Sequence, residues 1–164
     1  MKSTDKVLIG IVVGIVLLII VAFVVALAKP DPTYQTEDTP EGVAYNYLLA
    51  LQKEEYKRAY QYLSPKIKGY PASLETFIKH VHNNSWRFRL NNNETTLSVE
   101  STNITGNYAT VTVRETRFRG NDLFDSGQSI NTFNMELRLE SGEWKIVHSD
   151  YYFAWCWGYL DTCK

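Results

Sequence analysis

The sequence is short of several residue types, and each shortage excludes a class of function. Its 17 lysines and arginines nearly balance its 18 aspartates and glutamates, giving a net charge of −1. A nucleic-acid binder, by contrast, needs a basic surface that neutralises phosphates. There are only three histidines and two cysteines, and the sequence contains no metal-ligand cluster, nucleophile elbow or phosphate-binding loop. We therefore expect no metal and no cofactor. Aromatic residues, at 13% of the chain, argue against disorder.

What the sequence does have is one long apolar stretch, from Val7 to Ala28. As a helix rising ~1.5 Å per residue it would extend about 33 Å, enough to cross a hydrocarbon core of ~30 Å. Lysines precede it at positions 2 and 6, and acidic residues follow it. The positive-inside rule therefore predicts a single-pass anchor, with residues 1–6 in the cytoplasm and the rest outside the cell membrane. The alternative is a signal peptide cleaved after Ala26-Leu27-Ala28, which leaves the same domain outside.

Beyond the anchor, the pattern predicts a short linker at residues 29–38 and one outer domain at 39–164. Thr39 and Pro40 are typical of a helix start, and Ser73 caps another helix. Apolar residues at helical spacing indicate three short helices, which contain Val43–Leu51, Tyr56–Leu63 and Leu74–Val81.

From Trp86 onward the apolar period changes from helical spacing to two. Clear alternation predicts strands at Ala109–Val113, Phe133–Leu139 and Trp144–Ile146, with a tight turn at Ser141-Gly142. Weaker strands are expected near Trp86–Leu90 and Thr95–Ile104, and a loop at Gly120–Gly127. Helices followed by hairpin-joined strands are typical of an α+β domain, in which the helices cover one face of an antiparallel sheet.

Three segments resemble the nuclear transport factor 2-like superfamily: Glu55–Pro65, Ser73–Phe77 and Gly142–Ile146. The resemblance covers roughly Thr39 to Tyr152. It is to membrane-anchored or secreted bacterial members, including lumazine-binding-like domains of unknown function. It implies a cone, in which a strongly curved antiparallel sheet wraps around a helix and often encloses a pocket. It does not imply one function, because the superfamily includes isomerases, dehydratases, binding modules and dimerisation domains.

Enzymes of this superfamily use an acidic residue or an Asp–His pair inside the cone. His148 and Asp150 share strand parity with Trp144 and Ile146, so both would point inward if the strand stays regular. The competing interpretation places Asp150 in a loop. His80 and His82 diverge by about 200° on their helix and cannot both face one pocket. His148 and Asp150 are therefore the candidate catalytic residues.

The C-terminal tail is rich in aromatic residues, and Tyr152, Trp155, Trp157 and Tyr159 are candidate binding residues. Such rings supply contact area to a sugar or a protein partner, or lie at a membrane interface. Alternatively they plug the open end of the cone. Cys156 and Cys163, the only cysteines, are expected to form a disulfide in an oxidising compartment, with a contribution of roughly 2–3 kcal/mol.

These observations favour a membrane-tethered, extracytoplasmic binding or accessory module. Its expected partner is an envelope protein, a glycan or a small apolar ligand, and the module itself is a candidate homodimer. One alternative is a small acid–base enzyme, an isomerase or a dehydratase, with its site inside the cone. Another is a purely structural dimerisation domain.

Overall fold

The computed structural model describes residues 3–27, 32–89, 95–119 and 127–159. The chain divides into two compact units, Met1–Thr33 and Tyr34–Lys164. In the first unit, helix α1 (Ser3–Leu27) contains the largely apolar segment Lys6–Val24, which has a mean hydropathy of 3.5 and no burial. This segment is long and apolar enough to cross a membrane, and a signal sequence would meet the same test.

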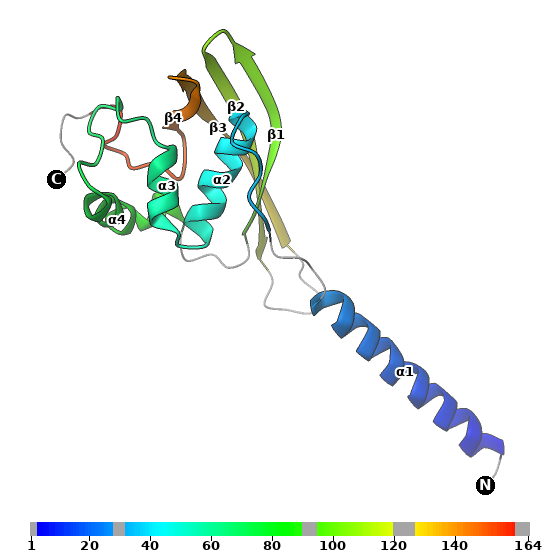
Figure 1. The fold of residues 1–164 in the computed structure, drawn as a ribbon. Coiled ribbons are helices and arrows are strands. Elements are labelled where there is room, and N and C mark those ends of the chain that lie inside the picture. Colours follow the sequence, from blue (N-terminus) through cyan, green and yellow to red (C-terminus); the bar gives the residue numbers. More distant parts are fainter. Residues whose placement is uncertain (1–2, 28–31, 90–94, 120–126, 160–164) are drawn as a thin grey trace. The chain divides into compact units, whose positions relative to one another are not determined.

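The second unit is an α+β domain whose described strands form one four-stranded sheet (Figure 1). Its strands follow one another in the sheet in chain order, and every neighbouring pair is antiparallel. The elements are α2 (Pro40–Gln52), α3 (Tyr56–Tyr62), α4 (Leu74–Asn83), α5 (Ser85–Phe88), β1 (Thr95–Thr105), β2 (Tyr108–Arg119), β3 (Gly127–Glu140) and β4 (Glu143–Ser149).

Local chemistry explains where these elements begin and turn. The Thr39 hydroxyl accepts a hydrogen bond from the Gly42 amide at 3.2 Å, and the Ser73 hydroxyl accepts one from the Thr76 amide at 3.2 Å. These are the two predicted N-caps. Ser141 and Gly142 both have positive φ angles, 52° and 90°, as a two-residue hairpin between β3 and β4 requires. The three predicted helices, the three clear strands and the weaker strand at Thr95–Ile104 are all confirmed.

The strand expected near Trp86–Leu90 is wrong, because Ser85–Phe88 form the short helix α5. The reason lies in the C-terminal segment. The Arg87 carbonyl accepts a hydrogen bond from the Tyr152 amide at 3.1 Å, and the Arg87 Nε donates to the Phe153 carbonyl at 2.9 Å. These residues pair with the chain after β4 and not with a strand of the sheet. The predicted loop at 120–127 lies outside the described residues, apart from Gly127 at the start of β3.

The sheet is not strongly curled, which corrects the curvature that the family resemblance implies. Register shifts, which bend strands, occur between Val99 and Ser101 in β1 and between Glu136 and Leu137 in β3. The central β2–β3 ladder runs without a shift from Tyr108–Arg138 to Arg119–Gly127. A long regular ladder between the bulges limits how far the sheet can wrap.

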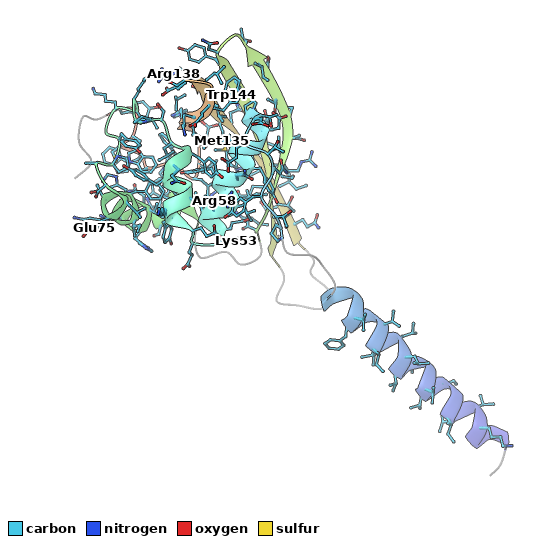
Figure 2. All side chains as sticks on the ribbon, viewed as in Figure 1. Lys53, Arg58, Glu75, Met135, Arg138 and Trp144 are labelled. Carbon is cyan, nitrogen blue, oxygen red and sulfur yellow. The ribbon has the colours of Figure 1, made fainter. Side chains whose placement is uncertain are left out.

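The core lies between the helices and the inner face of the sheet, where side chains fill the space (Figure 2). Helix α2 packs on β1, β2 and β4. The segment after β4 completes the core, because Tyr152, Phe153 and Trp157 are buried. The buried Tyr47 hydroxyl of α2 donates to the Tyr152 carbonyl at 2.6 Å and so joins this segment to α2.

Candidate functional site

The inner face of β2 changes from apolar to charged along the strand. Ala109, Val111 and Val113 are buried, and the next residues of the same parity are Glu115 and Arg117. Glu115 is 0% exposed. A carboxylate is very rarely buried to this extent unless other groups compensate its charge, so its partners determine what this end of the core can do.

Three side chains from different parts of the chain surround the Glu115 carboxylate. The Arg89 Nη1 contacts its Oε2, and the Arg117 Nη2 lies 3.2 Å from its Oε1. The Tyr152 hydroxyl donates to the same Oε1 at 2.8 Å. Arg89 follows α5 in the left-handed conformation, with φ 52°. The cluster therefore joins α5, β2 and the C-terminal segment.

A cavity of about 260 Å³ opens beside this cluster, and we call it the inner pocket. The Arg89 guanidinium lies 3.8 Å from the centre of the Tyr151 ring, which forms one wall. The Arg117 Nε is buried and has no hydrogen-bond partner among the residues that the structure describes. The residues that line the inner pocket are Arg89, Glu115, Arg117, Ser129, Ile130, Asn131 and Tyr151.

Among the described residues, the inner pocket has an excess of positive charge. Two guanidinium groups there face a single carboxylate, which leaves one cation uncompensated within the described part of the chain. Burial, and then the proximity of Arg117, lower the pKa of Arg89. Burial raises the pKa of Tyr152 to about 12, so its hydroxyl stays protonated and donates to Glu115 at neutral pH. An anion would relieve the repulsion between the two arginines.

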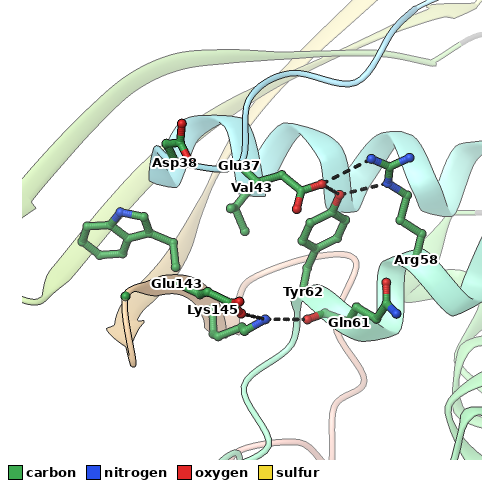
Figure 3. A pocket seen from close by; sticks show the side chains of 10 residues that line it. Glu37, Asp38, Val43, Arg58, Gln61, Tyr62, Glu143 and Lys145 are labelled. Atoms are coloured by element: carbon green, nitrogen blue, oxygen red, sulfur yellow. Dashed lines mark hydrogen bonds and ion pairs between the residues drawn. The ribbon is translucent and has the colours of Figure 1, made fainter.

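A second, larger hollow of about 750 Å³ lies between the start of α2, α3 and the β3–β4 turn (Figure 3). Its charged side chains are largely paired with one another. The Lys145 Nζ, for example, lies 2.7 Å from the Glu143 Oε2 and donates to the Gln61 carbonyl at 3.1 Å. The residues that line it are Glu37, Asp38, Val43, Arg58, Gln61, Tyr62, Gly142, Glu143, Trp144 and Lys145.

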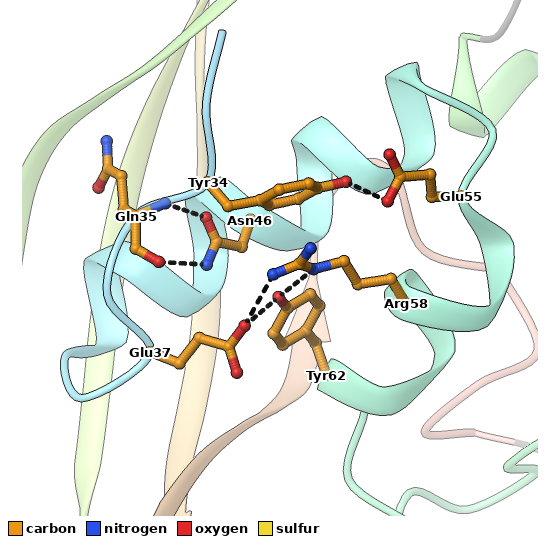
Figure 4. Close-up of polar contacts among 7 residues, drawn as sticks. All are labelled: Tyr34, Gln35, Glu37, Asn46, Glu55, Arg58 and Tyr62. Atoms are coloured by element: carbon orange, nitrogen blue, oxygen red, sulfur yellow. Dashed lines mark hydrogen bonds and ion pairs between the residues drawn. The ribbon is translucent and has the colours of Figure 1, made fainter.

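One wall of this hollow is the segment before α2, which is held by polar contacts (Figure 4). The Glu37 carboxylate accepts hydrogen bonds from the Tyr62 hydroxyl at 2.7 Å and the Arg58 Nη2 at 3.2 Å. The Arg58 guanidinium lies 3.4 Å from the centre of the Tyr34 ring, and the Tyr34 hydroxyl donates to Glu55 at 2.8 Å. Residues 34–38, which belong to the predicted linker, thus contact the domain.

The backbone of this segment is also fixed by Asn46 of α2, which is 0% exposed. The Gln35 amide donates to the Asn46 Oδ1 at 2.8 Å, and the Asn46 Nδ2 donates to the Gln35 carbonyl at 2.9 Å (Figure 4). The segment passes so close to Gly42 that a Cβ there would collide with the Thr36 carbonyl oxygen.

The predicted catalytic candidates lie outside both hollows. The His148 Nε2 and the Asp150 Oδ1 are 3.9 Å apart, and 52% of the Asp150 side chain is exposed. The other carboxylate oxygen of Asp150 accepts a hydrogen bond from the Asn134 amide at 3.0 Å. The His148 ring packs edge-on against Phe153. Each residue therefore has a structural contact at the end of the sheet.

The four aromatic candidates of the tail divide into two pairs. Tyr152 and Trp157 are buried, whereas Trp155 and Tyr159 are 54% and 67% exposed. Trp157 is surrounded by phenylalanine rings, and its Nε1 donates to the His80 Nδ1 at 3.0 Å. Burial, and then Lys79, lower the pKa of His80, which keeps its Nδ1 free to accept this bond.

The structure describes only one of the two cysteines of the predicted disulfide. Cys156 is buried, at 2% exposure, whereas Cys163 lies outside the described residues. The pairing therefore stays a prediction.

Sequence reasoning missed Arg89, Glu115 and Arg117 as site residues. A signal was present for two of them, because the alternation of β2 continues from Val113 through Glu115 to Arg117 without a change of parity. Charged residues on the inner face of a strand are unusual. No local signal places Arg89 or Tyr152 beside them, because the fold alone brings these residues together.

A scan against models of protein families and a search of curated proteins each find no match. Solved structures that the chain resembles include a SEC-C motif containing protein from Rhodopseudomonas palustris, at 12% identity over 71% of this chain and 81% of that chain, with a TM-score of 0.48. An NTF-2 like protein of unknown function from Shewanella oneidensis shares 12% identity over 65% and 90% of the two chains, with a TM-score of 0.43. An NTF2-like protein with a cystatin-like fold from Novosphingobium aromaticivorans shares 10% identity over 66% and 75%, with a TM-score of 0.45.

Two of these structures are NTF2-like proteins by their descriptions. The comparisons give no support to the lumazine-binding-like part of the predicted resemblance. Likenesses at such identities concern the fold alone, so the function has to be argued from the site.

Proposed function

We propose that this protein is a membrane-tethered binding module that holds a small ligand in the inner pocket. The observation that carries the proposal is a cavity lined by two guanidinium groups, those of Arg89 and Arg117, with Glu115 as the one carboxylate among the described residues that line it. Like charges that lie close together repel each other. An anionic ligand in the cavity would offset that repulsion, which gives the pocket a physical reason to be occupied.

The proposed location of the module is argued from its apolar helix. In this proposal α1 crosses the membrane, the lysines at positions 2 and 6 keep the N-terminus in the cytoplasm, and the α+β domain lies outside. An oxidising compartment would also allow the Cys156–Cys163 disulfide, which would hold the tail against the core. A cleaved signal sequence would place the same domain outside without the tether.

The geometry favours binding over acid–base catalysis. The candidate catalytic pair, His148 and Asp150, lies outside the inner pocket. One oxygen of the Asp150 carboxylate accepts a hydrogen bond from the Asn134 amide. Within the pocket, the Glu115 carboxylate contacts two guanidinium groups and accepts a hydrogen bond from the Tyr152 hydroxyl, so its oxygens already have partners. A binding role uses the same groups without requiring a proton transfer.

Native mass spectrometry on the full chain, purified from its own host in mild detergent, tests this function. We expect a small molecule to co-purify, and we expect Ser129→Trp, which fills the pocket, to abolish its binding. Thr132→Trp is the matched control, because Thr132 is exposed on the opposite face of β3. The proposal fails if the wild type carries no small molecule and also takes none from a metabolite extract of the host.

A further inference from the structure

The charge of the inner pocket limits the charge of its ligand. Among the described residues, Arg89 and Arg117 contribute two positive charges and Glu115 one negative charge, so a single further negative charge would balance them. A phosphate monoester carries about −1.5 to −2 at neutral pH and would leave an excess of negative charge. Uncompensated charge is costly in a buried site. A monoanion therefore fits better than a phosphate or a dicarboxylate.

The free donors of the pocket limit the shape of the anion. Arg117 uses an Nη2 on Glu115, while its Nε stays without a partner among the described side chains. A guanidinium presents its N–H groups in one plane, and a carboxylate matches that plane with two oxygens. Ser129 and Asn131 line the same cavity and add a hydroxyl and an amide. A carboxylate can meet the guanidinium groups with one oxygen and these polar groups with the other.

The volume of the pocket limits the size of the ligand. At about 30 Å³ per water-sized group, the 260 Å³ of the cavity corresponds to roughly eight or nine such groups. The Tyr151 ring provides apolar surface beside the charges. A carboxylate with a short apolar chain fits these dimensions better than a sugar polymer or a lipid.

We infer that the inner pocket binds a small monocarboxylate, held by Arg117 and Arg89 with Glu115 as the internal counter-ion. This inference rests on the proposed function, of which it names the ligand class. Glu115 neutralises one guanidinium, and the Tyr152 hydroxyl keeps its carboxylate in place. The second guanidinium is then left for the ligand.

The mechanism predicts opposite effects for the two charge-removing variants. Arg117→Gln removes the cation and should weaken carboxylate binding at least tenfold. Glu115→Gln removes the competing negative charge, so it should strengthen binding of the monoanion and also admit a dianion. Arg117→Lys keeps the charge but lacks the Nε and the planar fork, and should weaken binding several-fold. A cluster with a purely structural role would not give effects of opposite sign.

Isothermal titration calorimetry on the full chain in detergent, at constant ionic strength, tests the inference. The probes are butanoate, butanamide as its uncharged analogue, and succinate as a dianion, and circular dichroism checks that each variant is folded. We expect the wild type to show saturable binding of butanoate only. The three variants should differ from it as described above. If Glu115→Gln does not fold, the comparison of Arg117→Gln with Arg117→Lys still tests whether the pocket binds a carboxylate through Arg117.

Two failures can be told apart. In the first case a small molecule co-purifies with the wild type and is lost in Ser129→Trp, but it is uncharged or is not displaced by butanoate. The carboxylate class is then overturned and the binding function stands. Equal binding of butanamide and butanoate would have the same meaning. If no small molecule binds in either experiment, the proposed function itself is overturned, and the inference with it.

Discussion

Replacement of Trp157 by alanine should be among the most destabilising single changes in the domain. Its side chain is 0% exposed, and its ring centre lies 5.8 Å from that of Phe77, 5.9 Å from Phe88 and 4.9 Å from Phe153. Truncation of a buried aromatic residue to alanine costs about 3–5 kcal/mol. The lost hydrogen bond to His80 adds about 1 kcal/mol, so we expect a total near the upper end, at about 4–5 kcal/mol.

Trp155 provides the matched control, because it has the same side chain two residues away and is 54% exposed. Surface substitutions usually change stability by no more than about 0.5 kcal/mol. Urea unfolding of the full chain, followed by circular dichroism, measures both variants. With a slope of about 2 kcal/mol per molar urea, Trp157→Ala should lower the midpoint by about 2 M, whereas Trp155→Ala should barely move it. Equal losses for the two variants would refute the assignment of Trp157 to the core.

Three further predictions concern other parts of the domain. Because the pKa of His80 is lower in the folded state, its stabilising contribution should be complete above the unfolded-state pKa of about 6.5 and should be lost as the pH falls below that value. Unfolding curves between pH 7 and pH 5 should show this loss of stability, and the pH dependence should be absent in His80→Gln. Gly42→Ala should destabilise the domain by about 1–3 kcal/mol, since the new Cβ meets Thr36, and a gain in melting temperature would contradict this. Asn46→Leu should cost about 2 kcal/mol for its two lost hydrogen bonds and should speed proteolysis of residues 34–38, whereas unchanged cleavage would argue that the segment is not held there.

The sequence was most informative where the structure depends on neighbours along the chain. The caps at Thr39 and Ser73, the helical spacing that follows them and the turn at Ser141-Gly142 are local features, and each could be predicted. The strand expected at Trp86–Leu90 failed for the opposite reason. The state of that segment depends on hydrogen bonds to Tyr152 and Phe153, more than sixty positions away along the chain.

The candidate site could be predicted only in part, for the same physical reason. The alternation of β2 places Glu115 and Arg117 on the inner face, and that much can be read from the strand alone. The position of Arg89 beside them depends on how α5 ends. The division of the tail, with Trp157 in the core and Trp155 at the surface, depends on a path without regular secondary structure, for which no periodicity applies.

The buried charges at the end of β2 are difficult to explain by stability alone. Bringing ions out of water costs several kcal/mol for each, and apolar side chains of similar volume often stabilise a core as well or better. The same strand shows that apolar residues suit this face, because Val111 and Val113 occupy it directly beforehand. A strand that keeps its alternation but places Glu115 and Arg117 on this face is the kind of local departure that occurs at functional sites. The ligand that we propose would share the Arg117 charge and supply a purpose other than packing, and it would also account for the cavity beside these charges.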